Sequence, residues 1–492
     1  MLFPPSLDEM IEENHPVFIV DQVIDKLDIS PILEKYKGGG TSSYHPRMLL
    51  KVLIYAYINN IYSSRKIESA LKENIHFMWL SGMSYPDHNT INRFRGDRLK
   101  GVLKEVFKQV VILLAEAGLL NIKELYVDGT KIEANANKYT FVWGKSIKTS
   151  QERIKKQVNE LWDYAQSVAK EEMHSSKSDF TQIDAEKVTQ TIEKINNALE
   201  GKKVDKKVKQ KLNYAKKNWP SNLRKYEKQS KILGKRNSYS KTDQDATFMR
   251  MKDDHMQNGQ LKPGYNLQIA TNNQIIVNYT LHSNPTDTLT LKPHLLEYEA
   301  LYGSTPETLV ADSGYGSEEN YELLEQKNIE TFVKYNYFHK EQKQKKPDQN
   351  LLKADIFYNK EKDCCYCPMG QKMEKVEEVK RKTKSGYLQT YSIYQATNCK
   401  GCPLRTTCHK SQENRKIQRN HKLNKYKDKA RSNLLSELGV KHRKKRPCDV
   451  EVVFGNLKQN HHFKRFMLRG NEKVNIETGL MAIAHNLRKM AA

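Results

Sequence analysis

The stretch Tyr126-Val-Asp-Gly-Thr-Lys-Ile-Glu-Ala-Asn-Ala-Asn137 is the one from which the fold can be inferred. The residues from Leu125 to Val127 favour a short buried β-strand that ends at Asp128, and Gly129 then allows the backbone to turn. A carboxylate at the end of a buried strand is costly unless its charge is compensated, and a hard cation such as Mg²⁺ or Mn²⁺ would compensate it. The alternative is a turn aspartate that accepts hydrogen bonds from backbone N–H groups.

A second strand ends in the same way, in Thr308-Leu-Val-Ala-Asp-Ser-Gly-Tyr-Gly316, which places Asp312 at its end. Between the two lie a predicted hairpin over residues 264–281 and a predicted helix over 287–301; a helix and a strand follow over 318–334. Without an insertion after the first strand, this is the strand order of an RNase H-like core. The predicted class is therefore α/β (α+β), with both aspartates at one edge of the sheet.

A third carboxylate is found in Asp449-Val-Glu-Val-Val-Phe-Gly-Asn-Leu-Lys458. Glu451 and Lys458 are seven residues apart and share one face of a helix, so a helix packed on the sheet would deliver Glu451 to the two aspartates. Two alternatives stay open at this point. Glu451 could be an exposed charge that pairs with a lysine, and Asp449 could take the third position instead.

The composition indicates a polyanionic partner. The 492 residues contain 83 Lys and Arg against 58 Asp and Glu, a net charge of +25, which favours nucleic acid over a merely lysine-rich surface. The N-terminus lacks the basic start and apolar core of a signal peptide, and no apolar run is long enough to span a bilayer. We therefore expect a cytoplasmic protein that does not contact membranes.

Two stretches are predicted to contact DNA through basic helices. Residues 1–120 are predicted to be helical, and the segment Ser84–Arg95 has a turn followed by a helix exposing Arg93 and Arg95, as in a helix-turn-helix module. An ordinary helical bundle with a basic face is the alternative. Residues 145–241 are predicted to form a basic helical insertion that follows the DNA backbone, or else a solvated spacer.

A third stretch, residues 355–410, holds most of the cysteines. The Cys-x₂-Cys pairs Cys364/Cys367 and Cys399/Cys402 suit a structural, tetrahedral Zn²⁺ site in a zinc-ribbon-like insertion. Which of Cys364, Cys365 and Cys408 is a spare or alternative ligand stays open at this point. Free cysteines, a disulfide or an iron–sulfur cluster are the other interpretations.

Taken together, these motifs resemble a bacterial insertion-sequence transposase of the DDE class, in the subgroup called IS-eleven-eighty-two of the IS-four-like assemblage. The resemblance covers nearly the whole chain through five segments, which are YPDHNTINRFR, YVDGTKIEANANKYTFVW, GYNLQIA, LVADSGYG and VEVVFGNLKQNHHFKRFMLRG. It implies a helical DNA-binding domain over 1–120, an RNase H-like core over 121–144 and 242–354, and a C-terminal part of that core over 411–492. Residues 145–241 and 355–410 would be insertions.

The resemblance also implies roles for residues. Asp128, Asp312 and Glu451 would bind two Mg²⁺ or Mn²⁺ ions per active site, and Lys458 would contact DNA near the cut. The assemblage has an arginine four residues before the glutamate, where this chain has Pro447, and Arg446 is the nearest substitute.

The implied activity is cleavage and strand transfer on double-stranded DNA, at the terminal inverted repeats and the target. Lys464 and Arg465 would add DNA contacts, and a homodimer associated with the nucleoid is expected to act. The alternatives are a nuclease or resolvase on the same fold, and a catalytically silent DNA-binding descendant.

Overall fold

We describe the protein from a computed structural model, in which residues 6–36, 44–169, 184–251, 259–343 and 356–491 are described. The chain divides into two compact units. The first comprises Met1–Thr130, Asn266–Lys464 and Asn475–Ala492, and the second comprises Lys131–Tyr265 and Arg465–Val474. The predicted boundary between residues 354 and 355 lies outside the described residues.

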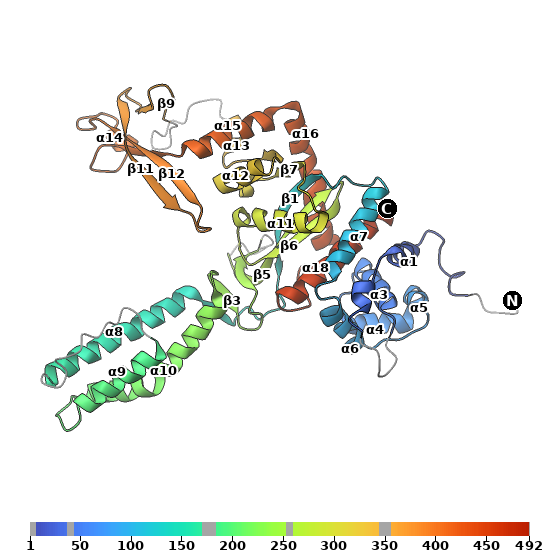
Figure 1. Cartoon of the computed structure of the whole chain (residues 1–492), viewed down its shortest axis with the longest axis horizontal. Coiled ribbons are helices and arrows are strands. Elements are labelled where there is room, and N and C mark those ends of the chain that lie inside the picture. The colour runs from blue at the N-terminus through green and yellow to red at the C-terminus, as the bar shows by residue number, and fades with distance from the viewer. Residues whose placement is uncertain (1–5, 37–43, 170–183, 252–258, 344–355, 492) are drawn as a thin grey trace. The chain divides into compact units, whose positions relative to one another are not determined.

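The first unit is built on a mixed sheet with the order β6-β5-β1-β7-β8 (Figure 1). Its strands are β1 (Glu124–Glu133), β5 (Leu261–Asn272), β6 (Ile275–His282), β7 (Thr308–Ala311) and β8 (Glu330–Val333). β5 and β6 form an antiparallel hairpin, whereas β1, β7 and β8 run parallel to one another. The mixed α/β class predicted from the sequence is confirmed.

The strand β1 corrects one prediction. It does not end at Asp128, because it continues through Gly129 to Glu133, so Gly129 is not a turn residue. A Cβ at Gly129 would lie 2.2 Å from Gln268 Nε2 and 2.7 Å from Asp287 Oδ1. Glycine is required there because two polar side chains approach the strand closely.

Helices of the first unit cover this sheet. They are α11 (Leu291–Tyr302), α12 (Glu318–Gln326), α15 (His421–Leu435), α16 (Glu437–Arg446) and α18 (Asn471–Ala491). α16 packs against β7 and β8, α11 packs against β6, and both α12 and α15 pack against β8. The buried Asn486 on α18 donates to the carbonyl of Ile276 and accepts from its N–H, each at 2.8 Å, and so completes the backbone pairing of β6.

The N-terminal part of the first unit is helical, in line with its apolar periodicity. Its helices are α1 (Pro16–Lys26), α2 (Ser30–Leu33), α3 (Pro46–Ile58), α4 (Ser64–Glu73), α5 (Ile75–Ser81), α6 (His88–Arg93) and α7 (Leu103–Glu116). Asp87 caps α6 by accepting a hydrogen bond from the N–H of Thr90 at 2.8 Å. A π-helical turn, η1 (Phe94–Arg98), follows α6 directly.

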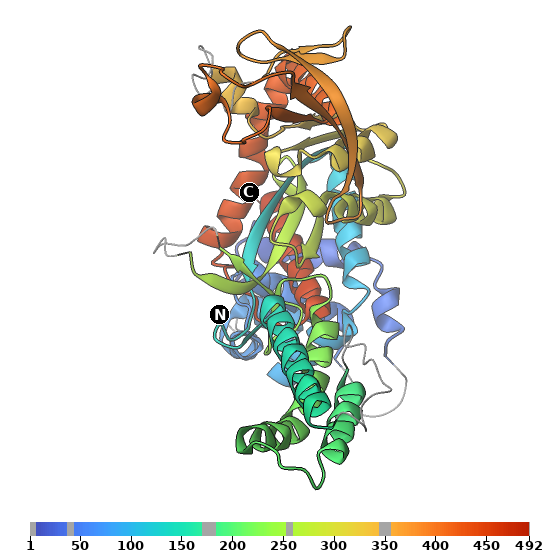
Figure 2. The same cartoon turned by 90° about the vertical axis from the view of Figure 1, so that its left-hand side faces the viewer.

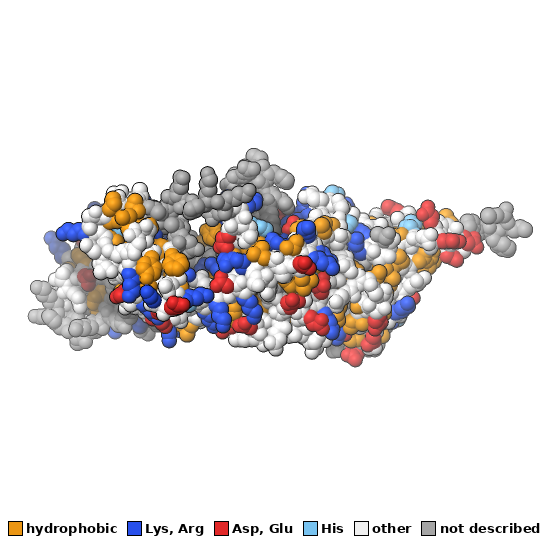
Figure 3. Space-filling model, turned by 90° about the horizontal axis from the view of Figure 1, so that it is seen from above, with side chains coloured by type: hydrophobic (Ala, Val, Ile, Leu, Met, Phe, Trp, Pro, Cys, Tyr) orange, Lys and Arg blue, Asp and Glu red, His pale blue; other side chains and the backbone are white. Residues whose placement is uncertain are grey.

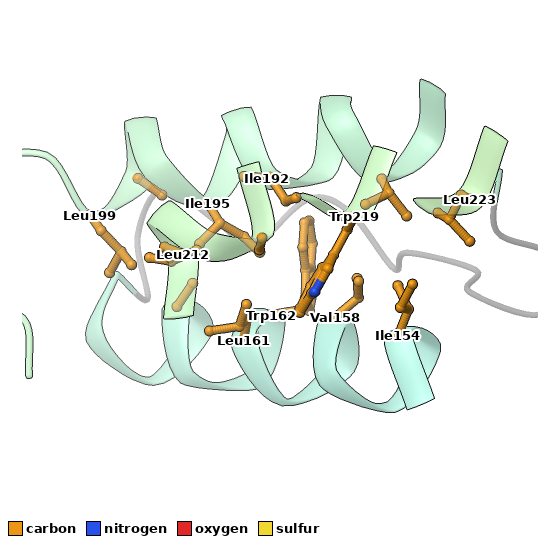
Figure 4. Close-up of a cluster of buried hydrophobic side chains, with 14 of the residues drawn as sticks. Ile154, Val158, Leu161, Trp162, Ile192, Ile195, Leu199, Leu212, Trp219 and Leu223 are labelled. Atoms are coloured by element: carbon orange, nitrogen blue, oxygen red, sulfur yellow. The ribbon is translucent and has the colours of Figure 1, made fainter. Parts of the chain in front are cut away.

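In the second unit, α8 (Gly144–Val168), α9 (Ala185–Ala198) and α10 (Lys206–Leu233) lie side by side, as both views show (Figures 1 and 2). Trp162 and Trp219 lie at the centre of their shared apolar core, with Val158, Ile192 and Ile195 around them (Figure 4). These helices therefore have a hydrophobic core of their own, which a solvated spacer would not need.

The second unit also contains short strands. They are β2 (Phe141–Trp143), which pairs with β3 (Ser238–Ser240), and β4 (Thr247–Arg250), which pairs with the start of β5. Tyr265 is buried and donates to both carboxylate oxygens of Asp243, at 3.0 and 2.9 Å. This pair ties the start of β5 to the loop before β4.

The cysteine-rich region of the first unit is an antiparallel sheet with the order β13-β12-β11-β10-β9. Its strands are β9 (Tyr358–Asn359), β10 (Cys364–Tyr366), β11 (Lys372–Lys382), β12 (Leu388–Ala396) and β13 (Lys416–Arg419), and the short helix α14 (Arg405–Cys408) lies between the last two. Cys365, Met373 and Tyr394 form its small core.

None of the helices in the described ranges combines the length and apolar character that a membrane crossing requires. On the face shown in Figure 3, Lys and Arg side chains are interspersed with Asp and Glu side chains. The positive excess is therefore mixed with acidic groups on this face and does not form one continuous basic surface there.

Candidate active site

The three predicted acidic residues converge on one guanidinium group. Nη2 of Arg446 lies 3.1 Å from Asp128 Oδ2 and 4.0 Å from Asp312 Oδ2, and its Nη1 donates to Glu451 Oε1 at 2.9 Å. These residues come from three segments that are far apart in sequence, β1, the turn after β7 and the turn after α16. The expected gathering of Asp128, Asp312 and Glu451 is therefore present in the structure.

The parallel pairing of β1 and β7 explains how the two aspartates meet. Val127 is the register partner of Ala311, so the next residues, Asp128 and Asp312, follow directly where the pairing of β1 with β7 ends. Asp312 is fixed by the N–H of Gly314, from which its Oδ1 accepts at 2.7 Å. Asp312 is 40% exposed at the side chain and Asp128 only 10%, so the pair lies at the boundary between core and solvent.

A π-helical turn brings Glu451 to the aspartates. Directly after Arg446 the helix continues as η4 (Pro447–Glu451), in which each hydrogen bond spans five residues. Residues five apart therefore lie on one face, and Arg446 reaches Glu451 across that spacing. The structure thus pairs the glutamate with an arginine five residues before it. In the IS-four-like assemblage, which the sequence resembles, the arginine stands four residues before the glutamate.

Asp449, the alternative to Glu451 as the third metal ligand, accepts hydrogen bonds from the hairpin of β5 and β6 instead. It is buried, its Oδ1 accepts from the hydroxyl of Thr271 at 2.6 Å, and its Oδ2 accepts from the N–H of Asn273 at 2.8 Å. Asn273 and Gln274 form the two-residue turn between β5 and β6, both with positive φ. Asp449 therefore anchors this hairpin turn, and Glu451 is the carboxylate that faces the two aspartates.

Asp287 is a fourth carboxylate at this edge, and the sequence analysis missed it. Its Oδ1 accepts from Asn266 Nδ2 at 2.8 Å and from Gln268 Nε2 at 2.9 Å. A Cβ at Gly129 would lie 2.7 Å from Asp287 Oδ1, so this glycine leaves room for the carboxylate. The available sequence signal was the glycine directly after Asp128.

Two further groups report the electrostatics of the site. Burial raises the pKa of Tyr315 well above its usual value, and the carboxylates of Asp287, Asp128 and Asp312 add to the shift. Desolvation lowers the pKa of Lys334, and the positive charge of Arg446 lowers it further. Negative and positive charges are thus close together at this site. Lys458, seven residues after Glu451, is buried within the π-helical turn η5 (Asn456–Asn460).

The donor set suits a hard cation, but the carboxylates do not yet form a ligand cluster. Carboxylate oxygens are the ligands that Mg²⁺ and Mn²⁺ prefer. In the described ranges no group of three or more His, Cys, Asp or Glu side chains is arranged to hold a metal ion. At this site the guanidinium of Arg446 lies among the carboxylates, so the residues fit a divalent cation only if that side chain moves.

The predicted DNA-contacting residues differ in accessibility. Arg93, Lys464 and Arg465 are exposed. Arg95 is only 2% exposed, and its guanidinium donates to Tyr62 O at 2.7 Å and to Asn92 Oδ1 at 3.0 Å. The prediction that the helix exposes Arg95 is therefore wrong, because its hydrogen bonds hold the turn after α6 to the helices beneath it.

The cysteines are only partly arranged as predicted. Cys367, Cys399, Cys402 and Cys408 line one pocket of 310 Å³ together with His409. Cys364, one of the predicted ligands, is buried on β10 and is not among the residues that line this pocket. Within the described residues, no three of these cysteines are arranged as a group that could hold a metal ion.

All seven cysteines are free thiols. Arg415 holds two of those around the pocket, since its Nη1 donates to Cys408 Sγ at 2.7 Å and its N–H donates to Cys399 Sγ at 3.3 Å. The alternative interpretation, a disulfide between two of these cysteines, is therefore not supported by the structure.

Comparison with known families found two matches. Residues 366–491 match the family model described as a transposase DDE domain, and residues 5–97 match a family model described as a transposase domain. No curated protein matches the chain. Glu451 lies inside the first match, whereas Asp128 and Asp312 lie outside both, and the two matches together support a transposase of the DDE class.

Proposed function

We propose that this chain is a DDE transposase that binds the ends of an insertion sequence and catalyses metal-dependent DNA cleavage and strand transfer. The observation that carries the proposal is the convergence of Asp128, Asp312 and Glu451 on one cationic group. The sheet order supports an RNase H-like core, since β6-β5-β1-β7-β8 is the third, second, first, fourth and fifth core strand in turn. The family matches support the same class.

In this mechanism the acidic residues would hold two Mg²⁺ or Mn²⁺ ions, which activate the attacking water or 3′-hydroxyl and stabilise the leaving oxygen. Asp128, the least exposed of the three, would hold these ions together with Asp312 and Glu451. Lys334 and Arg446 supply positive charge at this edge. Together with Lys458 they would orient the phosphates for in-line attack.

DNA contacts outside the site would come from exposed basic residues. We assign this role to Arg93, Lys464 and Arg465, and to the lysine-rich helices α8–α10. The DNA would be double-stranded and would include the terminal inverted repeats of an IS-eleven-eighty-two-type element and its target. Because an element has two ends, we expect two copies of the chain to act together.

We also propose a structural Zn²⁺ site in the cysteine-rich sheet, with Cys367, Cys399, Cys402 and Cys408 as ligands. Four thiols around one pocket support it, and thiolates are ligands that Zn²⁺ favours. Binding of Zn²⁺ by Cys408 requires that the hydrogen bond from Arg415 Nη1 to Cys408 Sγ be broken. Metal analysis of protein purified without added zinc should find about one Zn²⁺ per chain; finding none, with all thiols titratable, would remove this part of the proposal.

The test of the function uses DNA that carries the inverted repeats found beside the gene. Wild-type protein with Mg²⁺ or Mn²⁺ should cut these ends and join them to target DNA. Asp128→Asn should abolish both reactions and leave binding of the ends nearly unchanged, because the phosphates are held by basic residues. The control is Asp428→Asn, which changes an exposed aspartate paired with Arg431 and should leave activity intact.

Two outcomes would redirect the proposal. Cutting without joined products would indicate a nuclease or resolvase. Specific binding of the ends without any chemistry, in wild type as in Asp128→Asn, would indicate a silent DNA-binding descendant.

A further inference from the structure

Arg446 is at the position where a cation is needed. Its side chain is 5% exposed, and its two terminal nitrogens face the carboxylates of Asp128, Asp312 and Glu451 at 2.9–4.0 Å. The single positive charge of this guanidinium thus offsets part of the negative charge of the three neighbouring carboxylates. Such clustering is strongly unfavourable without a counter-charge.

The guanidinium is nevertheless incompletely satisfied in this position. Its Nε is buried and has no hydrogen-bond partner in the part of the chain that the structure describes. A buried donor without a partner is unfavourable, because it has lost its hydrogen bonds to water. Lys334 lies close enough to Arg446 for the two positive charges to repel, which contributes to the lowered pKa of Lys334. Arg446 therefore neutralises the carboxylates without being optimally bound itself.

We propose that Arg446 is an exchangeable counter-cation. In the metal-free protein its guanidinium binds the three carboxylates and holds them together. When divalent cations bind these carboxylates, the guanidinium leaves them and binds a DNA phosphate. This inference rests on the proposed function. A guanidinium suits both partners, because its planar array of N–H donors binds carboxylates and phosphates bidentately. The π-helical turn after Arg446 marks a local irregularity of the kind found at functional sites.

The exchange has a thermodynamic consequence. If carboxylates and phosphate compete for one guanidinium, metal binding and DNA binding must strengthen each other, and by the same factor in both directions. Removing the guanidinium should then free the carboxylates for the metal and abolish this coupling.

The experiment measures Mn²⁺ binding by the electron paramagnetic resonance signal of free Mn²⁺, using full-length protein with and without end DNA. We compare wild type with R446M, which removes the charge but keeps a long side chain. Without DNA, R446M should bind Mn²⁺ about tenfold more tightly or better, as expected when a charged hydrogen-bond competitor is lost. End DNA should tighten Mn²⁺ binding by wild type but not by R446M.

Two controls accompany the measurement. R431M removes another arginine that pairs with two carboxylates, Glu341 and Asp428, and should leave Mn²⁺ affinity unchanged. D128N should weaken Mn²⁺ binding whether or not DNA is present. If R446M does not fold without metal, R446K serves in its place: a smaller donor array should give Mn²⁺ affinity between those expected for wild type and R446M.

The outcomes separate the two proposals. Mn²⁺ binding that depends on Asp128 but is unchanged or weaker in R446M would overturn the exchange and leave the transposase proposal standing. Mn²⁺ binding that is insensitive to D128N would contradict the proposed function itself.

Discussion

At the scale of single residues, the site depends on how closely side chains can approach the backbone that follows each aspartate. Gly129 lies inside a strand and has an ordinary φ, so its role is to leave space for Gln268 and Asp287. Gly314 differs, because a Cβ there would lie 3.5 Å from Asp287 Oδ2, an ordinary van der Waals distance. At Asp128, the aspartate followed by glycine therefore reflects a packed group of polar side chains.

We predict that Gly129→Ala destabilises the protein by about 1–3 kcal/mol, the usual cost of forcing extra atoms into a packed region. Urea denaturation would measure it. Gly455→Ala is the control, because its Cβ would meet nothing within 4 Å and alanine favours a helix. Equal stability of Gly129→Ala and wild type would mean that Gln268 and Asp287 are not packed on the strand.

Asp449 and Glu451 should give opposite results when changed. Asp449→Ala should lower stability by about 1–3 kcal/mol, because buried donors of the hairpin turn lose their acceptor, while the folded protein retains chemistry. Glu451→Gln should remove DNA cleavage with little loss of stability. Denaturation and cleavage assays on both variants check this, and the reverse pattern would assign the third metal ligand to Asp449.

At the scale of secondary-structure elements, the π-helical turn η4 decides how the arginine and the glutamate meet. A single extra residue in a helix produces such a turn. We predict that deleting Cys448, an exposed residue of the turn, restores an α-helix in which Arg446 and Glu451 are four apart and still share a face. Cleavage activity should then survive within about tenfold.

Inserting one alanine after Cys448 is the matched change in the other direction. It should abolish cleavage, because a spacing of six residues places Arg446 and Glu451 on different faces of a helix. Equal activity in the deletion and insertion variants would show that the pairing of Arg446 with Glu451 is not needed.

The elements also show what a sequence can and cannot predict here. The strands that lead to Asp128 and Asp312 were predictable, because β-branched and aromatic residues mark them. The continuation of β1 from Gly129 to Glu133 was not, because a glycine after an aspartate is also typical of a turn. The π-helical turns were not, since a bond spanning five residues leaves no distinct periodicity in side-chain type. The exposure of Arg95 was predicted wrongly for a related reason. A basic residue on a predicted helix gives no sign that its guanidinium is buried.

At the scale of the whole molecule, histidines that are partly or fully buried should make stability depend on pH. Burial lowers the pKa of His282, His461 and His485 to about 4, against 6.5 in an unfolded chain. The unfolded state therefore binds more protons between these values, so their contribution is fully present above pH 6.5 and is lost as the pH falls toward 4.

Urea denaturation across that range would measure the loss. His485→Gln should reduce the slope of stability against pH, since His485 is buried and its Nε2 lies 2.9 Å from Gln274 O. An unchanged slope in His485→Gln would show that this histidine does not titrate as its burial implies.

The central claim is that segments around residues 128, 312 and 451 form one metal site. Replacing Mg²⁺ by Fe²⁺ and adding ascorbate and peroxide generates hydroxyl radicals at the metal, which cut the nearby backbone. We predict cuts in all three segments of the intact chain, suppressed by excess Mg²⁺ and absent in Asp128→Asn. Cuts confined to other segments, or unaffected by Asp128→Asn, would contradict the account.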